Sequence, residues 1–131
     1  MQHALFIYGT LVPGLRLEAE MRGARFMGAA QVPGRLVDLG RYPGLLHGEG
    51  QVTGEVYEVD DAHLARLDAV EDMVPGDRAA SQYWREGFTV VGGPLQGQRV
   101  QTYVYNCPTE GCRPIPHGDY RRYIREVGRE S

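Results

Sequence analysis

The first hydrophobic run of the chain predicts a buried strand that ends at a tight turn. Ala4 to Tyr8 have the length and the aromatic and β-branched content of such a strand. Gly9-Thr10-Leu11 then lead into Pro13 and Gly14, which are typical of a loop. Gly9 allows the backbone to approach a ligand closely, and successive N–H groups of such a turn can converge on an anion. The pattern predicts either a binding loop or an ordinary connection.

Gly9 and Gly14 also have the spacing of the two glycines in a phosphate-binding P-loop. That motif requires Lys and then Ser or Thr directly after the second glycine, and this chain has Leu15-Arg16 there. We therefore do not expect nucleotide binding. The residues from Leu15 to Arg22 are compatible with one or two helical turns, although their spacing is not cleanly helical.

Three further stretches in the first half have the hydrophobic pattern of strands. They cover Ala24 to Val32, Arg35 to Leu39 and Gln51 to Val59. We expect a break between the first two at Pro33-Gly34, because proline cannot donate to a central β-ladder. Arg41-Tyr42-Pro43-Gly44 is typical of a type II turn, in which Gly44 would supply the positive φ.

The second half adds a pair of strands and two helices. Tyr83 to Val91 and Arg99 to Asn106 predict a hairpin, because Gly, Gly and Pro occur in their connection. Asp60 is a good N-cap for a helix over Ala62 to Val70, whose residues mostly favour helices. In the tail from Gly118 to Val127, apolar residues at helical spacing among arginines predict a short amphipathic helix.

The composition favours one small, β-rich domain over residues 1–131. A chain of 131 residues can build one modest hydrophobic core, and 18 Gly with 8 Pro imply many turns between short strands. The net charge of −3 and the scattered arginines favour a small-molecule partner over nucleic acid or a membrane surface. The apolar runs are too short for a signal peptide or a transmembrane helix, so we expect a cytoplasmic protein, monomeric or homodimeric.

Cys107 and Cys112 are the two cysteines of the chain, and they lie in a segment typical of a loop. A reducing compartment would keep them as thiols, and a local disulfide is the alternative. With His117 they provide only three ligands, one fewer than a closed structural zinc site needs. We therefore expect no bound metal.

One carboxylate falls where an apolar residue is expected. On the predicted helix, Leu64, Leu67 and Glu71 stand at i, i+3 and i+7 and so share one face. Burial and the negative end of the helix dipole both raise the pKa of a carboxylate, which would suit Glu71 to act as a general base. Alternatively, the helix ends before Glu71, which then belongs to a solvated acidic cluster with Asp68 and Asp72.

Tyrosines on the later strands are further candidates for contacts with a ligand. Period-two alternation places Tyr103 and Tyr105 on one face of their strand, and Tyr83 begins the preceding strand. Their phenols could form hydrogen bonds with a ligand, although strand tyrosines are commonly half-buried packing residues.

These features resemble the γ-glutamylcyclotransferase-like superfamily. The similarity runs from Leu5 to Arg125 in the family's order, and it is strongest toward small bacterial and plant members and γ-glutamylamine cyclotransferase. The motifs that carry it are Tyr8-Gly9-Thr10-Leu11, Tyr42-Pro43-Gly44-Leu45, Gly54-Glu55-Val56-Tyr57-Glu58-Val59-Asp60, Leu67-Asp68-x-x-Glu71, Tyr83-x-Arg85, Tyr103-Val104-Tyr105 and Gly118-Asp119-Tyr120. The chain departs from the family at Asp72, because many members have Gly after the catalytic Glu.

The resemblance implies an α+β fold, a small mixed β-barrel with flanking short helices. It also implies that the loop of Tyr8, Gly9, Thr10 and Leu11 binds the substrate and that Glu71 is the catalytic acid/base. Tyr8 and Tyr83 are further candidates for orienting the substrate.

The reaction that the resemblance implies is the cyclisation of a small-molecule γ-glutamyl amine or amino acid to 5-oxoproline and a free amine, without a cofactor. A non-catalytic binding or interaction domain on the same barrel is the alternative. A hydrolase that acts on γ-glutamyl amides through water is a third possibility.

Overall fold

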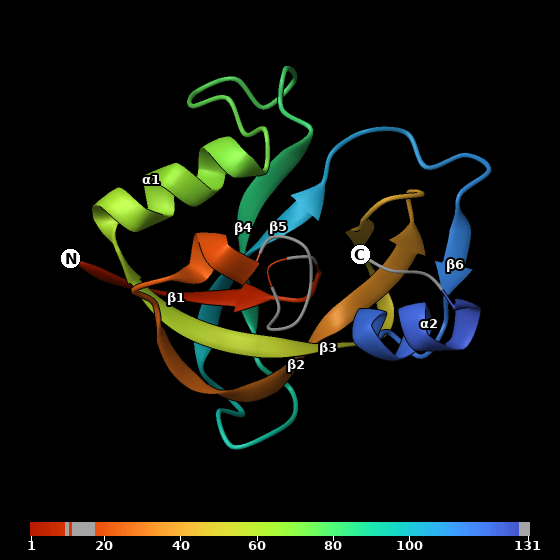
Figure 1. Cartoon of the computed structure of the whole chain (residues 1–131), viewed down its shortest axis with the longest axis horizontal. Helices are drawn as coiled ribbons and strands as arrows, with labels where there is room; N and C mark the ends of the chain where they lie inside the picture. Colours follow the sequence, from red (N-terminus) through yellow and green to blue (C-terminus); the bar gives the residue numbers. More distant parts are fainter. Residues whose placement is uncertain (10, 12–17, 129–131) are drawn as a thin grey trace.

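The computed structural model describes residues 1–9, 11 and 18–128. Its described strands form one six-stranded sheet in the order β4-β5-β1-β3-β2-β6 (Figure 1). The strands are β1 (Gln2–Ile7), β2 (Arg25–Asp38), β3 (Pro43–Asp60), β4 (Tyr83–Thr89), β5 (Arg99–Tyr105) and β6 (Arg113–Ile115). β1 pairs with β5 in parallel, and the other described neighbours pair antiparallel. The sheet is a half-barrel flanked by two short helices, which confirms the predicted fold class.

Strand β2 is continuous where the sequence predicts a break. Pro33 pairs with Gln51 of β3, and Arg35 pairs with Leu46, so the register shifts at Gly34. Between these two pairs β2 advances by two residues and β3 by five, so β3 bulges opposite Gly34. Such an irregularity accommodates a proline without ending the pairing. The predicted interruption at Pro33-Gly34 is therefore wrong.

The turn between β2 and β3 lies earlier than predicted. The Leu39 N–H donates to the Tyr42 carbonyl at 3.0 Å, and Gly40 supplies the positive φ of 107°. Gly44, which was expected to have that role, is paired with Val37 inside the sheet. The prediction of a type II turn over residues 41–44 is wrong, because β3 already begins at Pro43.

The helices form where the sequence predicts them. In α1 (Asp61–Val70), the Asp60 carboxylate accepts a hydrogen bond from the His63 N–H at 2.8 Å, as expected of an N-cap. Near the C-terminus, α2 (Tyr120–Val127) is capped by Asp119 in the same way. A 3₁₀ turn, η1 (Glu18–Met21), forms within the segment predicted to hold helical turns, and residues 15–17 of that segment lie outside the described residues.

Two hydrophobic clusters lie on the two faces of the central strand β1. Phe6 belongs to one cluster and Leu5 and Ile7 to the other, because successive side chains of a strand alternate. The first cluster includes the buried residues of α2, and the second includes Leu64 and Leu67 of α1. The two helices accordingly cover different parts of the sheet (Figure 1).

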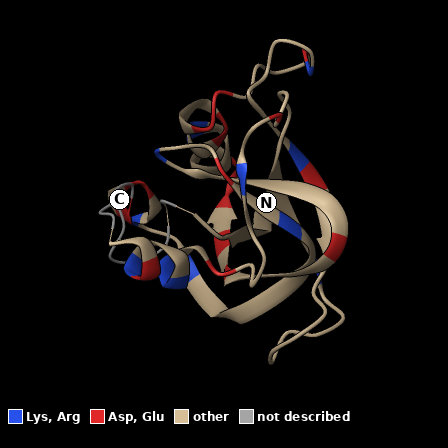
Figure 2. Cartoon of the chain, turned by 90° about the vertical axis from the view of Figure 1, so that its right-hand side faces the viewer, with Lys and Arg blue, Asp and Glu red and all other residues tan. Residues whose placement is uncertain are grey.

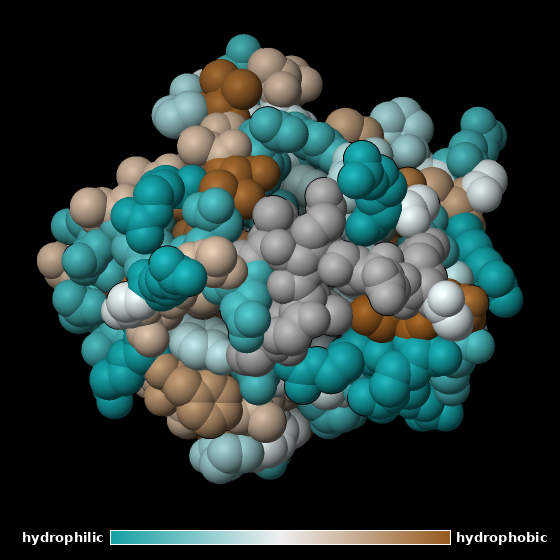
Figure 3. Space-filling view, viewed as in Figure 1, coloured by the Kyte–Doolittle hydropathy of each residue, from teal (hydrophilic) through white to brown (hydrophobic). Residues whose placement is uncertain are grey.

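The described surface is mostly polar. Hydrophilic residues cover most of the face in Figure 3, and the hydrophobic residues there form separate small groups. Acidic and basic residues are interspersed over the strands and loops, and α2 carries the basic positions Arg121, Arg122 and Arg125 (Figure 2). None of the described helices is both long and apolar enough to cross a membrane.

Candidate active site

A cavity of about 250 Å³ opens where β1 ends. Its walls come from the end of β1, the start of β3, the C-terminal end of α1, strand β5 and the segment that enters β4. Six of the candidate residues from the sequence line it, namely Tyr8, Gly9, Leu11, Glu71, Tyr83 and Tyr103, whereas Tyr105 does not. Thr10 lies outside the described residues. Tyr8 and Glu71 thus line the same cavity, although they are 63 positions apart in the chain.

Glu71 is the C-cap of α1 and projects into this cavity. The helix ends at Val70, one residue before Glu71, but the Glu71 N–H still donates to the Leu67 carbonyl at 3.0 Å. The helix thus ends at Val70 as predicted, and Glu71, which was expected in its last turn, is the capping residue that follows it. The alternative of a solvated cluster is wrong, because the side chain is only partly exposed and lines the pocket.

The surroundings of Glu71 favour its neutral form. Burial raises the pKa of Glu71 from the ordinary 4.5 to about 7, and the negative charge of Asp72 acts in the same direction. Asp72 follows at a left-handed φ of 55° and lines the same cavity. A carboxyl group with a pKa near neutrality can both accept and return a proton at physiological pH.

Three tyrosines of the cavity wall have their hydroxyl protons already donated to the protein. Tyr8 donates to the Tyr103 carbonyl at 2.6 Å, and Tyr83 donates to the Pro43 carbonyl at 2.7 Å. Tyr103 donates to the Asp68 carboxylate at 2.6 Å. Burial raises the pKa of each of these phenols, so they stay neutral. The Tyr8 oxygen also accepts a hydrogen bond from the Leu45 N–H at 3.2 Å. The three phenols therefore have no proton to donate to a ligand, and Tyr83 and Tyr103 are the better acceptors.

Tyr42 and Gln82 complete the wall, and sequence reasoning did not select them. The Gln82 Nε2 group donates to the Tyr42 hydroxyl at 2.7 Å, which leaves the Tyr42 hydroxyl able to donate in turn. The only sequence signal for Tyr42 is its place in the Tyr42-Pro43-Gly44-Leu45 motif. Gln82 has no local signal, because its role depends on a contact across 40 positions of the chain.

Gly9 is required by the close approach of β3. A Cβ added to Gly9 would lie 2.9 Å from Cγ of Pro43, which is closer than such atoms pack. The absence of a side chain thus lets Gly9 lie against Pro43 at the start of β3. The sequence predicts close approach of Gly9 to a ligand, and this stays a prediction beside the contact within the protein.

The cysteines take no part in this wall. Cys107 and Cys112 are free thiols, and the Cys107 thiol lies 3.9 Å from the Gln82 carbonyl. The disulfide considered as an alternative is therefore not formed. Within the described ranges, no group of three or more His, Cys, Asp or Glu side chains is placed to hold a metal ion.

Comparison with known proteins identifies the family. A family model described as "Gamma-glutamyl cyclotransferase, AIG2-like" matches residues 5–122. The chain belongs to this family. The superfamily predicted from the motifs is thereby confirmed.

Two curated relatives and one solved structure illustrate the similarity. The chain is 32% identical over 124 residues to the gamma-glutamylcyclotransferase family protein YtfP of Escherichia coli K12, and the match covers 88% of this chain and 94% of that protein. It is 39% identical over 111 residues to the gamma-L-glutamyl-butirosin B gamma-glutamyl cyclotransferase of Niallia circulans, covering 78% of this chain and 66% of that protein. The crystal structure of an AIG2-like protein of Mus musculus superposes with a TM-score of 0.67 at 28% identity, covering 91% and 94% of the two chains.

Proposed function

We propose that this protein cleaves a γ-glutamyl amine or γ-glutamyl amino acid by intramolecular aminolysis. The α-amino nitrogen of the substrate attacks its own γ-carbonyl carbon, a five-membered ring closes, and the bond to the leaving nitrogen breaks. The products are 5-oxoproline and a free amine, so the proposed reaction consumes neither water nor a cofactor. Because both reacting groups belong to one molecule, the main task of the site is to hold that molecule curled.

Glu71 is the proposed general base and general acid. The α-ammonium group must lose a proton before its nitrogen can attack, and the leaving nitrogen must gain one. A carboxylate of ordinary pKa is a weak base for this task, whereas the pKa of Glu71 is about 7. The position of this one carboxyl group, in the same cavity as the Gly9 loop, is the observation that carries the proposal.

The remaining polar groups of the cavity suit the two ends of such a substrate. The phenol oxygens of Tyr83 and Tyr103 can accept hydrogen bonds from the N–H groups of the substrate. Tyr8, whose hydroxyl already has two hydrogen-bond partners in the protein, would shape the wall around the substrate. The amides of Gly9 and Leu11 and the Tyr42 hydroxyl are the proposed donors to its carboxylate or to the carbonyl oxygen. Donors aimed at a developing oxyanion contribute ~3 kcal/mol to lowering a barrier of this kind.

The comparisons support this reaction over the two alternatives. The Niallia circulans relative is named for a cyclotransferase action on a γ-glutamyl compound. A partly buried carboxylate also costs stability, so a non-catalytic binding domain has little physical reason to keep Glu71. A hydrolase would use the same base on a water molecule, but it would release glutamate in place of 5-oxoproline.

The test is a screen of γ-glutamyl dipeptides and γ-glutamyl amines with the wild type and with Glu71→Gln. We expect the wild type to release 5-oxoproline from at least one substrate and the variant to lose this activity. Release of glutamate would replace the proposal with hydrolysis. If the wild type bound γ-glutamyl compounds but released no product, the non-catalytic alternative would hold.

A further inference from the structure

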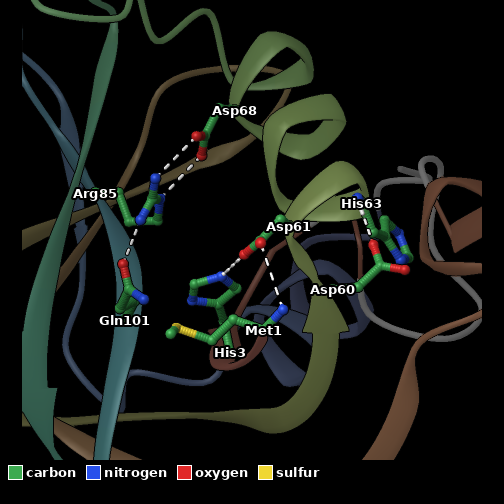
Figure 4. A network of polar contacts seen from close by, with 8 residues as sticks. All are labelled: Met1, His3, Asp60, Asp61, His63, Asp68, Arg85 and Gln101. Carbon is green, nitrogen blue, oxygen red and sulfur yellow. Dashed lines mark hydrogen bonds and ion pairs between the residues drawn. The ribbon is translucent and has the colours of Figure 1, made fainter.

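An ion pair beside the cavity joins the helix that ends at Glu71 to the strands that carry the cavity tyrosines. Arg85 of β4 donates from Nε to Oδ1 of Asp68 at 3.0 Å and from Nη2 to Oδ2 at 2.9 Å. Its Nη1 donates to the Gln101 side chain of β5 (Figure 4). Asp68 lies one helical turn before Glu71. One guanidinium group thus connects α1, β4 and β5.

This pair differs from a solvated surface contact. The Asp68 and Arg85 side chains are 11% and 21% exposed, and Asp68 also accepts the hydrogen bond from the Tyr103 hydroxyl. A bidentate contact fixes orientation as well as distance. When one partner of such a partly buried pair is removed, the remaining charge is left without compensation.

We propose that Asp68 and Arg85 are positioning residues of the proposed active site, which hold the end of α1 against β4 and β5 and cancel the charge of Asp68 beside Glu71. This inference rests on the proposed function only for its effect on turnover. The contact network and the charge balance can be tested without a substrate.

The charge on Glu71 depends on the titratable groups that surround it. The groups that interact with Glu71 or line its cavity are Asp72 after α1, Tyr8 directly after β1, Tyr83 on β4, Tyr103 on β5 and Tyr42 before β3. Asp68 lies one helical turn before Glu71 in α1. Tyr8, Tyr83 and Tyr103 are neutral because burial raises their pKa. The negative charge of Asp72 adds to the effect of burial on the pKa of Glu71. Asp68 is instead paired with the Arg85 cation at 2.9 Å.

Removing either partner should shift the titration of Glu71 in opposite directions. Asp68→Asn leaves the Arg85 cation uncompensated, which favours the ionised form of Glu71 and lowers its pKa. Arg85→Gln leaves the Asp68 carboxylate uncompensated, which disfavours the ionised form of Glu71 and raises the pKa of Glu71. A unit charge about one helical turn away at an effective dielectric constant of ~20 shifts a pKa by about two units before screening by salt. Each variant, and the double variant, is titrated by carboxyl-carbon NMR without a substrate.

A substitution that keeps the charge separates position from electrostatics. Arg85→Lys retains the cation and loses the bidentate contact. We expect the pKa of Glu71 to stay near the wild-type value, while kcat for 5-oxoproline release falls about tenfold or more because the base is displaced. KM should change little, since neither Asp68 nor Arg85 lines the cavity.

The matched control is the exposed pair of Arg25 and Glu58, whose atoms lie 3.2 Å apart away from the cavity. Glu58→Gln should leave both the titration of Glu71 and kcat unchanged. Opposite shifts in the single variants, with the double variant near the wild type, would support the inference. Shifts of the Glu71 pKa in the same direction, or no shift, would show that the ion pair does not set the charge of Glu71 and only connects the helix to the strands. If Arg85→Gln does not fold, the other two variants are sufficient. A lowered pKa of Glu71 in Asp68→Asn and a reduced kcat in Arg85→Lys would support the inference, and the absence of both changes would overturn it.

The proposed function can fail separately. If the wild type released no 5-oxoproline but the two titration shifts were opposite, the ion pair would still set the charge of Glu71 and the proposed reaction would be wrong. If the wild type were active and Arg85→Lys had unchanged kcat, the positioning role would be wrong and the reaction would stand.

Discussion

Helices α1 and α2 begin alike and end differently. Each is short and starts at an aspartate cap. The C-cap of α2 is Gly128 with a left-handed φ of 69°, a conformation that glycine adopts without a steric cost. The C-cap of α1 is Glu71, and the residue after it, Asp72, has the left-handed φ. The end of α2 is thus built for stability, whereas the end of α1 places two carboxylates at a cavity at some cost to stability.

The buried faces of the two helices show the same contrast. Helix α2 buries Tyr120, Tyr123 and Ile124 in the core. Helix α1 buries two leucines together with two polar side chains, His63 and Asp68. Both polar groups have partners on other elements, since His63 lies 2.8 Å from the Glu20 carbonyl and Asp68 is paired with Arg85. Helix α1 is therefore fixed by directed contacts, as expected of an element that positions a reactive group.

The largest expected effect comes from replacing the carboxylate at the end of α1 by an amide, compared with the same replacement at the end of α2. Glu71→Gln should reduce kcat for 5-oxoproline release by roughly 10²-fold or more, because the base is lost while the shape is kept. Glu126→Gln in the last turn of α2 is the matched control and should retain full activity. Steady-state assays of both variants on one γ-glutamyl substrate measure the difference. Near-normal turnover of Glu71→Gln would end the assignment of the base.

The same pair of variants should differ in stability as a function of pH. Because the folded-state pKa of Glu71 is about 7 and the unperturbed value is 4.5, the folded state binds this proton more tightly. The contribution of Glu71 to stability therefore decreases as pH rises from about 4.5 to 7. Relative to the wild type, Glu71→Gln should gain at most about 3 kcal/mol across this range. Urea unfolding at pH 5 and pH 8 tests this, and an equal difference at both pH values would contradict the raised pKa.

A smaller effect is expected at the loop that faces the end of α1. Gly9→Val should push the loop away from Pro43, because even the first added carbon would lie 2.9 Å from it. We expect KM to rise about tenfold, which corresponds to the usual cost of an overpacked contact. Gly9→Ala should give an intermediate value. Kinetic constants of Gly9→Val equal to those of the wild type would show that the loop is only a connection.

The smallest expected effect concerns the left-handed residue after α1. Asp72→Asn keeps a side chain that tolerates this conformation and removes the charge that raises the pKa of Glu71. The pKa of Glu71 should fall by less than about one unit, because burial is the larger cause. Carboxyl-carbon NMR measures the shift, with Asp119→Asn at the start of α2 as a control variant. An increase in the pKa would contradict the arrangement described here.

Local signals were sufficient to predict much of the fold. The strand β1, the Asp60 cap and the hairpin of β4 and β5 follow from hydrophobic periodicity and turn residues within short windows. The break predicted at Pro33 was wrong because the neighbouring strand, and not the local sequence, permits a bulge. The turn predicted over residues 41–44 was wrong for a similar reason, since Gly44 pairs with Val37 of β2 and so belongs to the sheet.

The site was predictable in part for the same physical reasons. Glu71 was identifiable because a carboxylate at helical spacing from two leucines is unusual, and the helix ends at Val70 as predicted, with Glu71 as its C-cap. Tyr42 and Gln82 meet only through tertiary packing, and no local pattern encodes that contact. The ion pair of Asp68 and Arg85 likewise joins residues 17 positions apart, and only the fold reveals that it is bidentate.

The most direct test of the account is the pH dependence of kcat/KM for the release of 5-oxoproline. This quantity reports the ionisations of the free enzyme and the free substrate, so its acidic limb should follow Glu71 and have its midpoint at about 7. A second limb at higher pH belongs to the α-ammonium group of the substrate, and a substrate methylated on that nitrogen identifies it. An acidic limb at about 7 in the wild type would support a buried carboxyl base at the end of α1. An acidic limb at or below 4.5 would show that the catalytic carboxylate is solvated, and the central claim would be wrong.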